Sequence, residues 1–162
     1  MNSPSVVFVI GLPGSGKTTV ASKLAEFHGY PLVTTEVISA RLHSVDRVKR
    51  DRDFSPGELQ EIYNVMCLLT DLLLSGGCGV VVDGVFRSRD QREQIFAIAA
   101  KHGARVLGYE VCCDEQVLLE RIKARKAEGT VSPAGEKAYY KIASEFEPTD
   151  GRFIRVDNSS SV

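Results

Sequence analysis

The 162-residue sequence lacks a net charge of either sign, because its 20 lysines and arginines nearly balance its 21 aspartates and glutamates. Such a balanced chain has no overall field that would attract nucleic acid or an anionic membrane, although a local basic patch is compatible with it. The sequence also has no apolar run near the roughly 20 residues that a membrane helix requires. These absences argue against a membrane-spanning protein and give no support to a lipid or polynucleotide partner.

Cysteine is scarce, and its positions form no recognisable binding pattern. The four are Cys67, Cys78, Cys112 and Cys113. They show no C-x-x-C spacing and no accompanying histidine pattern, and adjacent cysteines rarely bridge each other. We expect buried free thiols in a reducing cytosol rather than a metal or redox site. The N-terminus has no basic segment before its short apolar run, which we interpret as a strand rather than a signal peptide, so we expect a cytoplasmic protein.

Short apolar runs alternate with helix patterns along the whole chain. Strands are predicted over residues 6–10, 30–34, 79–83, 105–111 and 153–156. Helices are predicted over residues 18–28, 35–42, 55–74, 88–101, from 114 onward and over 136–146. No internal repeat or second domain is visible. The alternation predicts one α/β domain over residues 1–162, with a five-stranded parallel sheet flanked by helices and ligands beyond the carboxyl ends of its strands.

The most specific motif lies between the first predicted strand and the first predicted helix. Residues 11–19 fit the phosphate-binding loop pattern G-x-x-x-x-G-K-[ST] at every position. Glycines in such a loop let successive N–H groups turn toward a phosphate, and the helix N-terminus adds partial positive charge. Lys17 is placed to reach the β- and γ-phosphates, and Thr18 to offer its hydroxyl to Mg²⁺. The predicted nucleotide-binding residues here are Gly11, Leu12, Pro13, Gly14, Ser15, Gly16, Lys17, Thr18 and Thr19.

A carboxylate near the magnesium of a bound nucleoside triphosphate is expected at the end of a neighbouring strand. Asp83 fits this role, because three valines precede it and Gly84 follows. A guanine-reading Asn-Lys-x-Asp motif is absent, and Asp83 does not begin the Asp-x-x-Gly spacing of a GTPase switch. We therefore predict that Thr18 and Asp83 hold the metal of a triphosphate in a protein other than a GTPase switch.

Two arginines precede a segment rich in glycine, serine and proline. Arg121 and Arg125 are four residues apart and so share one helix face, just before residues 127–133. Such a pair suits a short lid, over about residues 121–135, that closes on a transferring phosphoryl group. The alternative is a solvated face in which both arginines pair with Glu120 and Glu128.

Several segments together resemble a family of small predicted kinases of the AAA type that bind ATP, related to zeta toxins, chloramphenicol phosphotransferase and polynucleotide 5′-hydroxyl kinases. The matching segments are residues 11–19, 80–86, 118–125, 131–132, 147–148 and 156–157, with Arg92 nine residues past Asp83. The resemblance covers nearly the whole chain and implies a P-loop NTPase fold. It also implies transfer of the γ-phosphoryl of Mg·ATP to a hydroxyl on a small molecule or a nucleic-acid end.

The same resemblance implies roles for further residues. The family typically carries Ser-Asp-x-x-Arg after its second strand, where the Asp takes the proton of the acceptor hydroxyl. This chain has Glu36 at the Asp position and Ser39 at the Arg position. Glu36 is therefore the expected base, with Arg41 in place of the missing arginine; the alternative for Glu36 is a carboxylate that only favours the helix start. Adenine is expected between the helix near Arg121 and the loop after the last strand, around Asp157 and Asn158.

The acceptor side is less specific. Arg87, Arg89 and Arg92 follow Asp83 closely and could hold an acceptor phosphate. Arg92 matches a family position, whereas the other two could equally be solvated surface. A polynucleotide acceptor stays open because of the basic stretch from Arg41 to Arg52, although the chain lacks a series of stacking aromatics. The rival from another class is an ATP-binding protein without turnover that acts through a partner.

Overall fold

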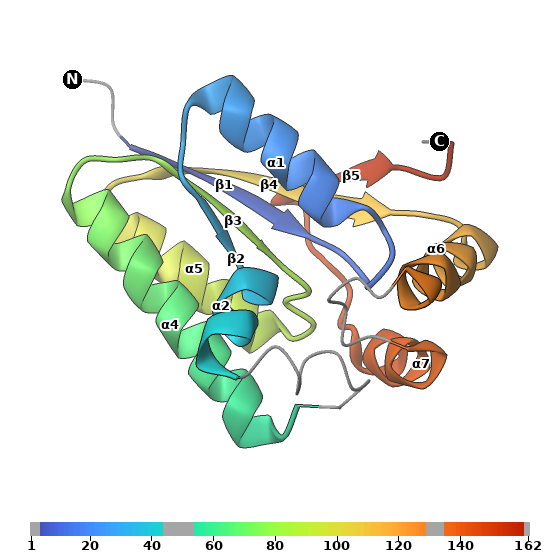
Figure 1. The fold of residues 1–162 in the computed structure, drawn as a ribbon. Helices are drawn as coiled ribbons and strands as arrows, with labels where there is room; N and C mark the ends of the chain where they lie inside the picture. The colour runs from blue at the N-terminus through green and yellow to red at the C-terminus, as the bar shows by residue number, and fades with distance from the viewer. Residues whose placement is uncertain (1–3, 44–53, 129–134, 161–162) are drawn as a thin grey trace.

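A computed structural model describes residues 4–43, 54–128 and 135–160 of the chain. Its five strands form one parallel sheet in the order β2-β3-β1-β4-β5 (Figure 1). The strands are β1 (Ser5–Ile10), β2 (Leu32–Thr34), β3 (Val80–Gly84), β4 (Arg105–Cys112) and β5 (Phe153–Asp157). The helices are α1 (Lys17–His28), α2 (Thr35–Leu42), α4 (Pro56–Ser75), α5 (Arg89–Lys101), α6 (Glu115–Ala127) and α7 (Glu136–Glu145). The α/β architecture predicted from the alternation is thus confirmed.

The two faces of the sheet are covered by different helices, as period-two alternation along buried strands requires (Figure 1). Val7 and Val9 of β1 face α1, where they pack with Ala21. Val6 and Phe8 face the other side, where they join residues of α4 and α5 such as Met66 and Ile95 in the larger core cluster. Each face therefore has its own apolar core, which explains why the central strands read as unbroken hydrophobic runs.

The register of the sheet determines where the site forms. Strand β3 lies directly beside β1, with Val9 opposite Asp83, and β2 lies on the other side of β3, with Thr34 opposite Asp83. The chain after β1 is the glycine loop, and the chain after β2 is the start of α2. The loop, Asp83 and Glu36 consequently meet at one edge of the sheet, beyond the carboxyl ends of adjacent strands.

Side-chain caps mark the starts of three helices. Ser55 and Glu58 form a capping box at the start of α4, with Ser55 N donating to Glu58 Oε2 at 2.8 Å. Ser88 forms a second capping box with Gln91 at the start of α5. At the start of α2, the hydroxyl of Thr34 accepts from Val37 N at 3.0 Å. This last cap fixes the direction of the helix that carries Glu36.

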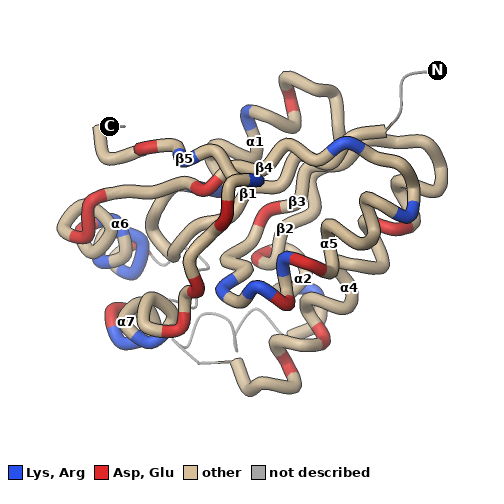
Figure 2. Tube along the Cα trace, turned by 180° about the vertical axis from the view of Figure 1, so that it is seen from behind, with Lys and Arg blue, Asp and Glu red and all other residues tan. Residues whose placement is uncertain are grey.

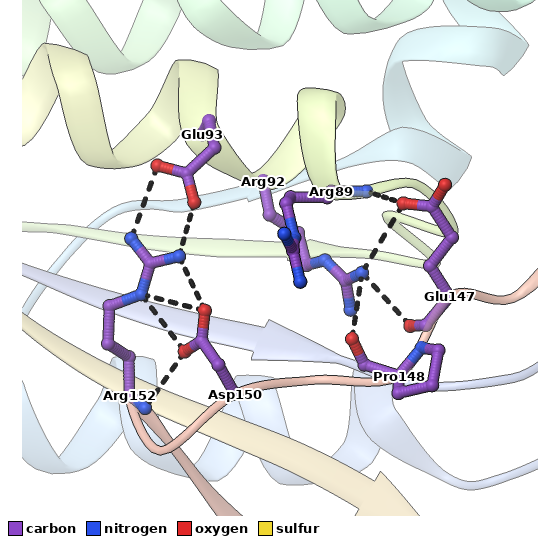
Figure 3. A network of polar contacts seen from close by, with 7 residues as sticks. All are labelled: Arg89, Arg92, Glu93, Glu147, Pro148, Asp150 and Arg152. Carbon is purple, nitrogen blue, oxygen red and sulfur yellow. Dashed lines mark hydrogen bonds and ion pairs between the residues drawn. The ribbon is translucent and has the colours of Figure 1, made fainter.

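A polar network joins α5 to the chain that leads into β5 (Figure 3). The buried Arg92 donates to the carbonyl oxygens of Glu147 at 2.9 Å and Pro148 at 3.4 Å. Arg152 bonds Asp150 on its own turn and Glu93 on α5. The network fixes the segment after α7 against the end of the molecule that holds the site.

Basic and acidic residues are interspersed over most elements of the described chain rather than separated on two faces (Figure 2). This agrees with the near-zero net charge of the sequence. None of the helices in the described ranges is both long and apolar enough to cross a membrane. The four cysteines are free, but the prediction that they are buried was wrong, because Cys78 lies exposed between α4 and β3 and the other three are only partly buried. Part of the predicted lid, residues 129–134, and most of the stretch from Arg41 to Arg52 lie outside the described residues.

Candidate nucleotide and acceptor site

The glycine loop connects β1 to α1 in a conformation that requires glycine at two positions. Gly14 and Gly16 have φ of 82° and 84°, in the left-handed region that side chains disfavour. A Cβ atom on Gly14 would lie 2.9 Å from the carbonyl oxygen of Leu118, and one on Gly16 would clash with the amide of Asn158. The loop therefore has no room for side chains there, and its main chain can turn its N–H groups toward a ligand.

Thr18 and Asp83 meet although 65 residues separate them in the sequence. Thr18 Oγ1 donates to Asp83 Oδ2 at 2.9 Å. The Asp83 carboxylate is buried, and its other oxygen, Oδ1, has no hydrogen-bond partner among the described residues. Burial raises the pKa of Asp83, whereas the neighbouring Lys17 and the bond from Thr18 lower it.

A hydroxyl beside a carboxylate with an oxygen that lacks a partner fits a hard divalent cation, which prefers oxygen ligands. These two residues, which come from the loop and from the adjacent strand, are the ones predicted for Mg²⁺. The buried hydroxyl of Ser15 also has no partner among the described residues. Since it lies within the glycine loop, it is a further polar group that a bound phosphate could satisfy.

Lys17 stands at the first turn of α1, between charges of both signs. Burial lowers the pKa of Lys17, as does the nearby Arg125, whereas Asp83 and Glu36 raise it. A lysine partly removed from water and held near other cations gains from an anionic ligand, because the ligand compensates the cost of burying its charge.

One cavity of about 140 Å³ brings most of the predicted catalytic and metal-binding side chains together. Its charged and hydroxyl-bearing walls come from the start of α1, from α2, α4, β3 and α6, and from the segment before α5. They are Lys17, Thr18, Thr35, Glu36, Ser39, Tyr63, Asp83, Arg87 and Arg125. The predicted base, metal ligands and phosphate-binding lysine thus line one cavity.

Glu36 reaches this cavity from the first turn of α2. Its charge is close enough to Lys17 to raise the pKa of that lysine. Arg41 lies in the last turn of the same helix, is exposed and does not line the cavity. The structure therefore places the two predicted acceptor-binding residues of α2 apart, with only Glu36 facing the nucleotide loop.

Arg121 contacts the loop from outside the cavity. Its guanidinium lies 3.4 Å from the carbonyl oxygen of Gly14 and donates to Asn158 O at 2.9 Å. The Asn158 amide in turn donates to Ser15 O at 2.8 Å. Asp157 is exposed and accepts from Ser159. Arg121 and Asn158 therefore join α6 and the chain after β5 to the glycine loop. The sequence pattern did not predict the contact between Asn158 and Ser15.

Arg87 and Arg92, both predicted for the acceptor, have different surroundings. Arg87 lines the cavity and forms an ion pair with Glu145 at the end of α7. Arg92 does not line the cavity, and its guanidinium lies 5.6 Å from the ring centre of Phe146 and bonds the two main-chain oxygens described above. Arg92 thus contacts the segment after α7 rather than the cavity.

Sequence reasoning missed the apolar wall of the cavity and Tyr63. The wall is formed by Pro13, Phe54, Leu59, Ile62, Val85 and Ile142. Leu59, Ile62 and Tyr63 lie in the first half of α4, where the sequence shows an ordinary apolar stripe. A stripe of this kind predicts burial but does not distinguish packing against the sheet from lining a cavity.

Several known proteins with related sequence or structure carry kinase names. The chain is 29% identical over 136 residues to 6-phosphofructo-2-kinase/fructose-2,6-bisphosphatase 1 of Mus musculus, a match that covers 77% of this chain but 29% of that protein. A sugar kinase from Janibacter sp. HTCC2649 superposes with a TM-score of 0.73 at 15% identity, covering 95% of this chain and 85% of the other. A gluconokinase from Sinorhizobium meliloti 1021 gives 0.72 at 21% identity, over 96% and 82% of the two chains.

These structural likenesses, at low identity, concern the fold. The sequence match that identifies the family is a model described as an AAA domain, which covers residues 6–149. That range begins in β1 and extends past α7, so it includes the glycine loop, Asp83 and the helix with both predicted lid arginines. The chain belongs to the AAA domain family and has the fold of the small P-loop kinases.

Proposed function

We propose that the protein is a kinase that transfers the γ-phosphoryl of Mg·ATP to a hydroxyl group. The observation that carries the proposal is the single cavity shared by Lys17, Thr18, Asp83 and Glu36. A phosphate-binding lysine and a metal-binding pair alone would serve any nucleotide-binding protein. A carboxylate in the same cavity adds a group that can receive a proton from an acceptor.

In this proposal the glycine loop and Lys17 hold the β- and γ-phosphates and orient the terminal phosphorus toward Glu36. A Mg²⁺ bound by Thr18 and Asp83 would supply positive charge to the phosphate oxygens. Arg125, which lines the cavity, adds a second cation from α6. Arg121 acts indirectly, because it contacts the loop carbonyls and so positions the loop against α6.

The transfer step would use side chains that line the same cavity. The acceptor oxygen attacks the γ-phosphorus while the bond from that phosphorus to the bridging oxygen breaks, and ADP leaves. The acceptor hydroxyl gives its proton to the Glu36 carboxylate. Lys17 and Arg125 stabilise the charge on the transferring group.

For the acceptor, this proposal specifies only that it carries a hydroxyl group. The named relatives act on sugars and related molecules, which supports a small hydroxylated acceptor. The interspersed surface charges give less support to a nucleic-acid end.

The test is to replace Glu36 with Gln, which keeps the shape of the side chain and removes its basicity. We expect Glu36→Gln to bind ATP as the original protein does and to lose about a hundredfold or more of its transfer rate from γ-labelled ATP. Glu26→Gln, in the exposed part of α1, is the matched control and should leave both quantities unchanged.

Two results would separate this proposal from its rival. Transfer by Glu36→Gln at the original rate would remove Glu36 from the mechanism. Binding of ATP without transfer to any hydroxyl compound would favour a protein that binds nucleotide without turnover.

A further inference from the structure

The part of the cavity wall that does not serve phosphate or metal is mainly apolar. Phe54, Leu59, Ile62 and Ile142 contribute it, together with Val85 after β3. A polyhydroxylated or strongly charged molecule would lose hydration against such a wall without recovering hydrogen bonds. An apolar molecular body would instead be stabilised there by removal of its surface from water.

Tyr63 is the polar exception in this wall. Its side chain lines the cavity while the residue is only 6% exposed. Its hydroxyl oxygen accepts from Phe86 N at 3.1 Å. A phenol has one hydrogen to donate in addition to the bonds its oxygen accepts. No described residue accepts that hydrogen, so it is free to bond a ligand in the cavity.

The surroundings of Tyr63 fix its orientation. Phe86 has a φ of 47°, which is uncommon for a residue other than glycine, and its ring packs against Tyr63 and Phe8 with centroids 5.0 Å and 4.6 Å away. This packing holds the Phe86 N–H against the Tyr63 oxygen. Burial also raises the pKa of Tyr63 to about 12, so the phenol keeps its hydrogen at neutral pH.

The cations that line the cavity are already engaged. Arg87 is ion-paired with Glu145, and Lys17 lies near Asp83, Glu36 and Arg125 on the side of the phosphate loop. The carboxylate of Glu36 would repel an anionic acceptor. Among the described lining residues, Lys17 and Arg125 serve the transferring phosphate in the proposed function and Arg87 is paired with Glu145, which leaves no further cation for a phosphate, sulfate or carboxylate group on the acceptor.

We propose that the acceptor is a small uncharged alcohol with an apolar body, and that Tyr63 binds a second oxygen of it through its hydroxyl hydrogen. The proposal rests on the kinase function proposed above, because Glu36 is taken to face the reacting hydroxyl. Tyr63 is then a specificity-determining residue that binds the acceptor and takes no part in proton transfer.

The experiment measures binding of three probes by calorimetry to the whole protein saturated with Mg²⁺ and a non-hydrolysable ATP analogue. Styrene glycol carries two hydroxyls on an apolar body, glycerol lacks that body, and glycerol phosphate adds an anionic group. We expect styrene glycol to bind at least about tenfold more tightly than either of the others, the gain that burial of an aromatic ring provides.

Variants then test the assigned hydrogen bond. Tyr63→Phe should weaken binding of styrene glycol about tenfold, as expected for one buried hydrogen bond, and leave affinity for the ATP analogue unchanged. Tyr30→Phe is the matched control, because Tyr30 does not line the cavity and should bind both as before. Retained affinity for the analogue also shows that Tyr63→Phe is folded.

The inference is overturned if glycerol phosphate or glycerol binds more tightly than styrene glycol, or if Tyr63→Phe binds styrene glycol as the original protein does. The kinase proposal is judged separately, by transfer of labelled phosphate. Transfer to an anionic acceptor would support the kinase and contradict this inference. Binding of styrene glycol with the predicted loss in Tyr63→Phe, but with no transfer to any alcohol, would support this inference and contradict the kinase proposal.

Discussion

The surroundings of Lys17 in the folded chain have opposing effects on its pKa. Burial lowers its pKa, and Asp83 and Glu36 only partly oppose that effect. A triphosphate would add several negative charges beside it, so ligand binding would relieve the cost of burial. The lysine is thus better suited to the nucleotide-bound state than to the free one.

We predict that Lys17→Ala weakens ATP binding about ten- to hundredfold, the range for loss of a charge-assisted hydrogen bond. The nucleotide-dependent rise in melting temperature should shrink at an ATP concentration that stabilises the original protein. Lys23→Ala, an exposed lysine on the same helix, is the control. Unchanged stabilisation in Lys17→Ala would mean that the nucleotide lies elsewhere.

Arg92 offers a second test at the scale of one residue. Since its guanidinium bonds two main-chain oxygens and is almost fully buried, we predict that Arg92→Gln lowers the free energy of unfolding by about 2–4 kcal/mol. Arg89→Gln, which retains the main-chain N–H that contacts Glu147, should change it by less than about 0.5 kcal/mol. Urea denaturation measures both. A stable Arg92→Gln with a raised KM for the acceptor would instead support the acceptor role suggested by the sequence.

At the scale of the elements, ionisable groups join α5 to the turn before β5, and their contribution to the stability of the fold depends on pH. Arg152 lowers the pKa of Glu93 and of Asp150 below their ordinary values of 4.5 and 3.8. Carboxylates with a lowered pKa stabilise the fold above their ordinary pKa, and this contribution is lost as the pH falls through the lowered values. Both groups are solvent-exposed, so screening keeps the effect small.

We therefore predict that Arg152→Gln lowers the melting temperature slightly at neutral pH and that the difference from the original protein narrows as the pH falls into the strongly acidic range. Thermal unfolding followed over a pH series measures this difference. Arg105→Gln, at the exposed start of β4, serves as the control. A difference that stays constant or grows at acidic pH would show that the carboxylates are not responsible.

The elements themselves were largely predictable from the sequence. Unbroken runs of β-branched residues such as Val80–Val82, bounded by glycines, favour strands buried on both faces, and capping residues such as Ser55 and Ser88 indicate helix starts. The glycine loop was equally clear, because its function depends on consecutive residues. Asp83 was found because its strand ends there.

Side chains whose roles depend on distant partners were not predictable in the same way. Tyr63 looks like any aromatic residue in a helix stripe, and only the turn at Phe86 reveals its free donor. Asn158 reaches Ser15 across 143 positions of sequence, and no local pattern signals that contact. Arg92 matched a family position, yet its contacts depend on where the chain after α7 lies.

At the scale of the whole molecule, the fold brings residues from distant parts of the sequence together around one cavity. Residues from α1, α2, α4, β3 and α6 line one cavity, so a bound nucleotide would join segments that are separate in sequence. A ligand that binds only the folded state stabilises it in proportion to the logarithm of its concentration over its Kd.

We predict that Mg²⁺ with a non-hydrolysable ATP analogue, at a concentration of about one hundred times the Kd, raises the melting temperature by about 5–10 °C. Removal of the metal with a chelator should abolish most of this rise in melting temperature. Asp83→Asn should lose a similar part of the rise even when the metal is present. An equal shift with and without the metal would contradict the assignment of Thr18 and Asp83 as its ligands.

The most direct test of the account is a crystal structure of the protein with Mg²⁺ and the same analogue. The account predicts the β- and γ-phosphates within the glycine loop, the Lys17 Nζ atom against the terminal phosphate, and the Glu36 carboxylate on the side of the γ-phosphorus opposite the bridging oxygen. An analogue bound outside the loop, or a Glu36 side chain turned away from the γ-phosphorus with the cavity closed between them, would contradict it.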